Sequence, residues 1–171
     1  MLHTALKAVL LRELGALRRS VDAYPDDASV WAQPPGVPNA AGTLVLHLTG
    51  NLQHYLGAVL GGTPYRRDRP AEFSRRDVSR ADLLAEIDAT SAAIGTTFAA
   101  LGTVGHDRPS PAYPEPVGGR AVATDDYLIH IAAHLAYHLG QIDYHRRIVT
   151  GDARGVDAVR PQELPPFPDP E

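Results

Sequence analysis

Four stretches of helical periodicity, separated by segments rich in proline and glycine, restrict this chain to an all-α fold. Apolar residues recur at three- and four-residue steps within residues 2–23, 39–61, 79–102 and 124–150, as expected for helices that bury one face. Prolines and glycines gather between these stretches and interrupt the helical pattern. We predict four helices of about twenty residues each, packed as a four-helix bundle with long connecting loops.

The segments between and after these helices are expected to be irregular. Residues 24–38 contain too many prolines for a helix, and residues 63–78 form an arginine-rich connection that is expected to be solvated and salt-bridged. Residues 103–123 are expected to form another long loop. Residues 1–151 then make up the predicted bundle domain, and residues 152–171 form a polar, proline-rich C-terminal tail outside it. The long connections leave the order of the helices in the bundle open.

Charge and cysteine content limit the classes of partner and chemistry. The chain has 16 basic and 20 acidic side chains, and this net charge of −4 gives no electrostatic reason for nucleic-acid binding. It has no cysteine, which excludes disulfides, thiolate metal ligands and a cysteine nucleophile. No membrane-spanning stretch or secretion signal is recognised, so we expect a soluble, cytoplasmic protein with no nucleic-acid or membrane partner.

The eight histidines are concentrated on two of the predicted helices. The last helix carries His130, His134 and His138 at four-residue steps, which place their Cβ atoms on one face, about 5–6 Å apart. Imidazoles at that spacing can bind one metal ion at distances of about 2.0–2.1 Å. The second helix adds His47 and His54. A single buried histidine is usually a hydrogen-bonded core residue, but burying several without a shared function costs desolvation at each one. We therefore predict a metal site.

The pattern of residues argues against three other kinds of catalytic centre. A zinc protease needs glutamate directly after the first histidine of the pair, whereas Ile131 and Leu135 stand at these places. A serine hydrolase of the usual type needs a Gly-x-Ser-x-Gly turn, which the chain lacks. A carboxylate-bridged di-iron bundle needs Glu-x-x-His on paired helices, and neither histidine-bearing helix contains glutamate.

Two segments resemble the DinB-like (DinB/YfiT) superfamily of four-helix-bundle metalloproteins. Residues 44–57 contain a histidine, His47, early in the second helix, where this superfamily places its first metal ligand. Residues 134–141 contain two histidines four apart, followed by x-Gly-Gln, which is similar to the superfamily's signature in the fourth helix. The resemblance implies that His47, His134 and His138 bind a divalent metal ion, either zinc or nickel.

Five neighbours of these histidines are candidates for contacts with the ligands or for the pocket around them: Asn51, His54, His130, Tyr137 and Gln141. We expect His130 to pack against the ligating rings or to fix their orientation. The other histidines, His3, His106 and His145, are expected at the surface. Gly140 is expected to let another helix approach closely. No catalytic residue is identified from the sequence.

Three neutral nitrogen ligands leave a divalent ion with a net positive charge and an open position, which is the arrangement of catalytic sites. The resemblance implies a metal-dependent transferase that moves a low-molecular-weight thiol, bacillithiol or mycothiol, in stress or detoxification. Two alternatives remain open: a metal-dependent hydrolase of a small ester or amide, and a non-catalytic metal-binding stress protein. A small-molecule substrate and a homodimer are further expectations.

Overall fold

The computed structural model describes residues 2–101, 110–164 and 166, and in this part of the chain it contains helices but no extended strand. The α-helices are α1 (Leu2–Asp22), α2 (Asp27–Trp31), α3 (Ala41–Leu52), α4 (Arg69–Ser74), α5 (Arg80–Leu101) and α6 (Thr124–Thr150). A π-helix, Gln53–Leu60, continues α3, and a short 3₁₀-helix, Pro161–Glu163, follows α6. The prediction of an all-α chain is confirmed.

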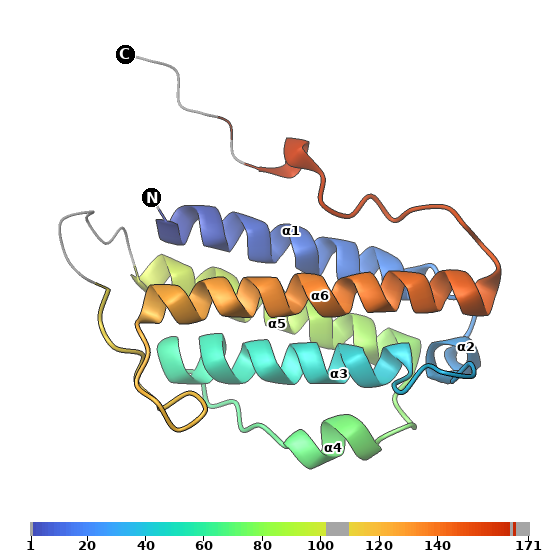
Figure 1. Cartoon of the computed structure of the whole chain (residues 1–171), viewed down its shortest axis with the longest axis horizontal. Coiled ribbons are helices and arrows are strands. Elements are labelled where there is room, and N and C mark those ends of the chain that lie inside the picture. The colour runs from blue at the N-terminus through green and yellow to red at the C-terminus, as the bar shows by residue number, and fades with distance from the viewer. Residues whose placement is uncertain (1, 102–109, 165, 167–171) are drawn as a thin grey trace.

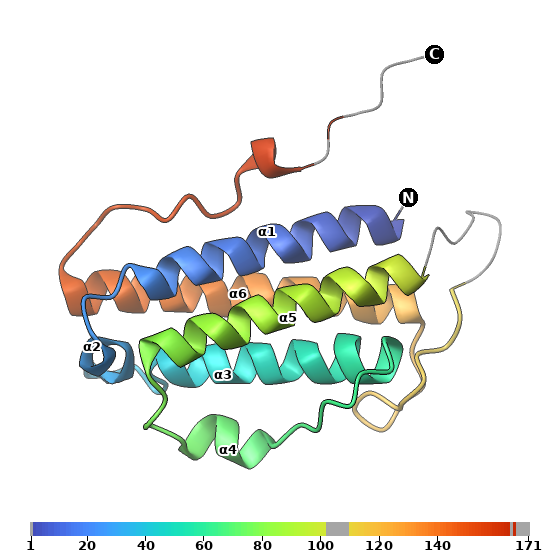
Figure 2. The same cartoon turned by 180° about the vertical axis from the view of Figure 1, so that it is seen from behind.

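The four long helices α1, α3, α5 and α6 lie side by side (Figure 1). Both α5 and α6 contact α1, and both also contact α3. Figure 1 and Figure 2 show that α1 and α6 run in one direction, whereas α3 and α5 run in the other. Because α3 and α5 run in the same direction, the connection that joins them must run back along the length of the helices. Helix α4 lies in this connection and packs on α3. Because α6 contacts α3 and runs in the opposite direction, α3 and α6 are antiparallel neighbours.

A single apolar core is shared by the four long helices. Each helix turns branched aliphatic side chains inward, as its periodicity predicts, and burying each one contributes about 1.5–3 kcal/mol. Side chains with no exposed surface include Leu10, Leu14, Leu17, Leu48, Leu83, Ile94, Leu128, Leu135 and Ile142. In the described residues, no helix combines the length and the apolar character needed to cross a bilayer.

Two connections that were predicted to be irregular contain short helices. In α2, Asp26 accepts a hydrogen bond from the Ser29 main-chain nitrogen at 2.8 Å, and the Ser29 side chain completes a capping box. In α4, Asp68 accepts one from the Ala71 nitrogen at 3.0 Å. The prediction was wrong because proline interrupts only a helix interior. Pro70 lies in the first turn of α4, where a missing N–H has no consequence.

The C-terminal segment after α6 lies against α1 and α6 over its first part. Arg19 of α1 donates to the Val156 carbonyl at 2.9 Å, and Arg146 of α6 donates to the Asp152 carbonyl at 3.3 Å. The Arg146 side chain is 1% exposed, so its hydrogen bonds are made in a buried setting. These contacts attach residues 152–157 to the helices by their main chain.

The start of α3 is fixed by close packing between Gly42 and the Trp31 ring of α2. A Cβ atom at Gly42 would lie 2.6 Å from the Trp31 Cη2 atom, which is closer than real contacts allow. The Trp31 ring is held in place because its Nε1 donates to the Val78 carbonyl at 2.8 Å. This contact sets α2 against the N-terminal end of α3, one turn and a half before His47.

We expect Gly42→Ala to push the Trp31 ring out of its place and to shift its fluorescence to longer wavelength. Trp31 is the only tryptophan in the chain, so the emission spectrum reports this ring alone. Gly95→Ala is the control, because a Cβ there would meet no atom of the described residues within 4 Å. The control should keep the emission and gain about 0.5–1 kcal/mol in free energy of unfolding. Unchanged emission in Gly42→Ala would contradict the packing described.

Candidate metal centre

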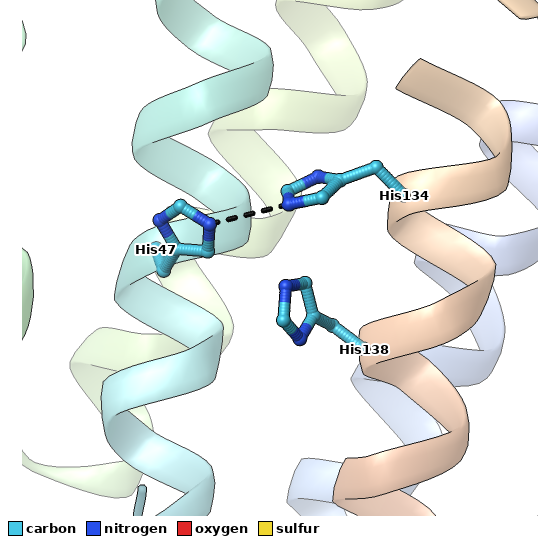
Figure 3. Close-up of side chains that lie close together, drawn as sticks. All are labelled: His47, His134 and His138. Atoms are coloured by element: carbon cyan, nitrogen blue, oxygen red, sulfur yellow. Dashed lines mark hydrogen bonds between the residues drawn. The ribbon is translucent and has the colours of Figure 1, made fainter. Parts of the chain in front are cut away.

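Helices α3 and α6 bring three histidines together (Figure 3). His47 lies on α3, His134 and His138 lie one turn apart on α6, and the three rings converge on the space between the helices. One nitrogen from each ring lies within 4.8 Å of the others. Among the residues that the structure describes, this is the one group of three or more histidine, aspartate or glutamate side chains with such a spacing.

The separation of two of these nitrogens fits tetrahedral metal coordination. The Nε2 atoms of His47 and His134 are 3.3 Å apart. Two ligands at about 2.05 Å from one ion, at the tetrahedral angle, are separated by about 3.3 Å. The His138 ring lies edge-on to the His134 ring, with centroids 4.6 Å apart. Three imidazole nitrogens form a donor set that suits zinc and nickel.

The outer nitrogen of His47 is held by a buried ion pair. His47 Nδ1 donates to Glu72 Oε2 at 3.0 Å, and Arg67 donates to both Glu72 oxygens at 2.6 and 2.9 Å. Because the proton is on Nδ1, the lone pair of His47 is on Nε2 and faces His134. A carboxylate that binds the outer nitrogen of a ligating histidine fixes its ring and raises its basicity.

Opposing effects act on the Glu72 carboxyl. Burial raises its pKa, but the hydrogen bonds from His47 and Arg67 together outweigh burial, so the pKa lies below its usual value. Glu72 is therefore ionised at neutral pH and can accept both hydrogen bonds.

The expectation that the arginine-rich connection is solvated is wrong for Arg67, whose side chain is 10% exposed. Sequence reasoning missed both residues, although the Asp68 cap and Pro70 are signals of the short helix that carries Glu72.

The outer nitrogen of His138 also has a hydrogen-bond partner. His138 Nδ1 donates to the Gln141 side-chain oxygen at 2.7 Å, across three residues of α6. This bond leaves the lone pair of His138 on Nε2, as in His47. Gln141, which the sequence suggested as a residue that contacts a ligand or lines the pocket, therefore hydrogen-bonds to a proposed ligand.

Two of the three rings are kept neutral by their surroundings. Burial, followed by the neighbouring His138 and His47 rings, lowers the pKa of His134 to about 4. Burial also lowers the pKa of His138, although the hydrogen bond with Gln141 opposes this change. Neutral imidazole is the form that binds metal ions. The geometry and the protonation state of this group are therefore compatible with a cation.

The other two histidines near the group do not join it. The exposed His130 ring stacks on the His134 ring, with centroids 6.3 Å apart and an angle of 18° between the planes. The role expected for His130 at the metal site stays a prediction. His54 Nε2 lies 3.6 Å from a carboxylate oxygen of Glu115, and His54 is not a member of the three-histidine group.

The remaining candidates lie on the same two helices. Asn51 follows His47 by one turn, and its buried Oδ1 has no hydrogen-bond partner within the described residues. Tyr137 is 65% exposed and meets the His138 ring edge-on, with centroids 5.2 Å apart. A Cβ at Gly140 would have no neighbour within 4 Å in the described part of the chain, so the expected close approach of another helix is wrong for the helices present.

Two histidines that were expected at the surface are buried. His3 is 8% exposed and contacts Asp125 at 2.9 Å, which joins the start of α1 to the start of α6. His145 is 3% exposed, and its Nδ1 lies 2.7 Å from the Tyr24 hydroxyl. The prediction was wrong because neighbouring segments cover faces of α1 and α6 that a single helical pattern does not reveal. His106 lies outside the described residues.

The family model described as the DinB superfamily matches residues 10–142, which include all three histidines. The chain belongs to the DinB superfamily. No curated protein and no solved structure matches it. The resemblance identified from the sequence is therefore confirmed by a match over most of the chain.

In this DinB-superfamily chain, α3 changes to a π-helix at Gln53, six residues after His47. The Gly61 nitrogen donates to the Leu56 carbonyl at 2.9 Å, five residues back, as in a π-helix. The Thr97 hydroxyl of α5 donates to the same carbonyl at 3.1 Å and so supports this geometry. The sequence prediction treated residues 39–61 as one helix and did not anticipate this change.

Gly50 allows Glu72 to reach His47. A Cβ atom at Gly50 would lie 2.3 Å from Glu72 Oε1 and 2.9 Å from its Cδ. Because Arg67 and His47 hold the Glu72 carboxylate from two sides, this carboxylate cannot move without losing a hydrogen bond. Alanine at position 50 would therefore disturb the support of His47 while leaving all three histidines in the chain.

We expect Gly50→Ala to weaken zinc binding by about tenfold or more, the effect typical of losing an outer hydrogen-bond partner of a ligating histidine. The measurement is competition with a chromophoric chelator. Glu72→Gln tests the same contact directly and should weaken binding in the same direction. Gly140→Ala is the control, because it adds a methyl group to α6 without a close contact in the described residues. Equal zinc affinity in all four proteins would contradict the role given to Glu72.

Proposed function

We propose that this protein is a four-helix-bundle metalloprotein that binds zinc or nickel through His47, His134 and His138. We further propose that it transfers a low-molecular-weight thiol, bacillithiol or mycothiol, to a small electrophile. The observation that carries the proposal is the donor set: three imidazole nitrogens within reach of one ion. Among the described residues, the group contains no fourth histidine, aspartate or glutamate. Three protein ligands and an open position are typical of catalytic rather than structural sites.

The charges around the three histidines support an anionic ligand at the open position. The negative charge of Glu72 is balanced by the positive charge of Arg67, which binds both of its oxygens. The imidazoles bring no charge when they bind a metal ion. The protein therefore leaves the charge of a divalent ion unneutralised. Such an ion supplies a Lewis acid that favours the thiolate form of a bound thiol over the thiol.

In the proposed reaction, the thiol sulfur forms a bond to an electrophilic carbon, and the leaving group departs with the bonding electron pair. The proton of the thiol passes to solvent. Glu72 and Gln141 hold the rings of His47 and His138 in place through their outer nitrogens. Asn51 Oδ1, which has no hydrogen-bond partner in the described part of the chain, offers an acceptor for an N–H or O–H group of the thiol. Capture of electrophiles in this way would serve detoxification or stress resistance.

The proposal is tested by adding bacillithiol and mycothiol to cobalt-loaded protein. Either thiol is expected to produce a sulfur-to-cobalt charge-transfer band, and its binding should tighten as the pH rises toward about 8.5, the pKa of a cysteine-like thiol. The matched control is the same compound with a hydroxyl in place of the thiol. If neither thiol changes the spectrum, the transferase proposal fails. Hydrolysis of small esters by the same protein would then favour a hydrolase, and an inert site would favour a non-catalytic metal-binding stress protein.

A further inference from the structure

A cavity of about 220 Å³ lies about one helical turn along α3 and α6 from the three histidines, none of which lines it. It is lined by residues 36–39, by Leu44 of α3 and by the last part of α6. Leu44 comes three residues before His47, and Gln141 comes three residues after His138. On each helix, this wall residue therefore lies about 5 Å along the helix axis from the histidine proposed as a ligand. Because α3 and α6 are antiparallel, both steps lead in the same direction from the histidines (Figure 1).

The wall of this cavity is mostly apolar, and its polar members, Asn39, Gln141 and His145, carry no formal charge when the imidazole is neutral. Its apolar members are Val37, Pro38, Leu44, Tyr144 and Ile148. The buried imidazole of His145 also lines it, and burial lowers the pKa of this residue. Both nitrogens of His145 have hydrogen-bond partners in the fold, the Tyr24 hydroxyl at 2.7 Å and the Ala32 carbonyl at 2.8 Å. No charged side chain is among the residues that line the cavity. An occupant with a charge here would lose hydration without compensation.

The volume of the cavity suits a group of about the size of one ring. An apolar protein cavity of about 150 Å³ binds benzene, whereas sites for drug-sized ligands measure about 300–1,000 Å³. The volume of about 220 Å³ lies between these limits. Two of the side chains in the wall, Tyr144 and Ile148, are 69% and 59% exposed, so the cavity can be reached from solvent.

Gln141 belongs both to this cavity and to the histidine group. Its side-chain oxygen accepts the hydrogen bond from His138 Nδ1, so its N–H groups remain available as donors at the border. We propose that the cavity binds the apolar, ring-sized part of an electrophilic substrate whose reactive carbon lies at the three histidines. This inference rests on the proposed function. It makes the cavity the part of the site that selects for aromatic or branched aliphatic electrophiles.

The first test uses metal-free protein, so that it does not depend on metal chemistry. Benzyl alcohol is titrated into ¹⁵N-labelled protein, and amide shifts are followed by NMR. Shifts are expected at Val37, Gln141 and Ile148, with none at Ile129 near the other end of α6. Ile148→Asp should abolish the effect by adding a charge to the wall. Ile129→Asp is the matched control, since this isoleucine lies on the same helix, outside the cavity, and is 51% exposed.

The second test asks whether the cavity and the histidines hold one ligand together. The dissociation constants of acetohydroxamate and phenylacetohydroxamate are compared on zinc-loaded protein. The phenyl compound should bind at least about tenfold more tightly, because its ring is removed from water in the cavity. Ile148→Asp and Val37→Trp should bring the ratio close to one, and Ile129→Asp should retain it. Val37→Trp provides a second variant, because it fills the cavity from the segment of residues 36–39 instead of from α6.

The outcomes separate the two proposals. Absence of any benzyl alcohol shift, with or without metal, overturns the cavity as a binding site. A shift with benzyl alcohol but a hydroxamate ratio near one in the unmodified protein overturns its link to the histidines. Failure of acetohydroxamate to bind zinc-loaded protein counts against the open metal position, and hence the proposed function, while the benzyl alcohol result still decides the cavity.

Discussion

Replacing His47, His134 or His138 with alanine is expected to weaken zinc binding by about a hundredfold or more, because each change removes one of only three protein ligands. The loss should be similar for the three variants, since each ring contributes one nitrogen to the group. Affinity is measured by competition with a chromophoric chelator at neutral pH. Zinc bound only by the folded state also stabilises it, so the rise in melting temperature on adding zinc should disappear in each variant.

The controls for these variants are the two histidines that lie nearby without joining the group. His130→Ala removes a ring that stacks on His134 and Tyr127, and His54→Ala removes one that faces Glu115. Both proteins should bind zinc within about threefold of the unmodified chain, because no ligand is lost. A His47→Ala protein with full affinity would mean that α3 does not supply a ligand. Loss of binding in His54→Ala would place the metal ion further along the same helix.

The second large effect is the dependence of stability on pH in the metal-free protein. Its free energy of unfolding should fall by about 2–3 kcal/mol between pH 7 and pH 4 through His134 alone. The pKa of His134 is lowered from 6.5 to about 4 in the folded state, first by burial and then by the neighbouring His138 and His47 rings. Between these two values the unfolded chain binds a proton that the folded chain does not. Stability therefore rises with pH in this range and is lost as the pH falls.

The measurement is urea unfolding of metal-free protein at several pH values. His138 and His145 also have lowered pKa values, both chiefly because of burial, so part of the pH dependence comes from them. The matched variant is His134→Gln, which keeps a polar side chain without a titrating ring. The pH dependence should be smaller in this variant by about 2–3 kcal/mol. If the two proteins show the same pH dependence, His134 is not held neutral by its surroundings.

The long helices could be predicted from the sequence because each buries one face along its whole length. The spacing of Leu10, Leu14 and Leu17, for example, requires a single buried stripe, and all three are fully buried. The short helices α2 and α4 could not be predicted in the same way. Each spans less than two turns, so no period is visible, and both depend on capping contacts such as that between Asp26 and Ser29.

The three histidines could be identified because two lie one turn apart on a single helix. Glu72, which binds His47, and Arg67, which binds Glu72, could not be identified in this way. They come from a connection whose path depends on the direction of α3 and α5. Gly50 illustrates the same limit: its importance comes from a carboxylate 22 residues later in the chain. His145 was placed wrongly at the surface because α2 and the following loop, rather than a long helix, cover it.

The central claim is that one ion is bound by three imidazoles and keeps a position for an outside ligand. The most direct test is X-ray absorption spectroscopy of zinc-loaded protein, before and after addition of bacillithiol or mycothiol. We predict four light ligand atoms at about 2.0–2.1 Å, with outer-shell scattering from three imidazoles, and one sulfur at about 2.3 Å after the thiol is added. A spectrum with a different number of imidazoles, or without sulfur at saturating thiol, would contradict this claim.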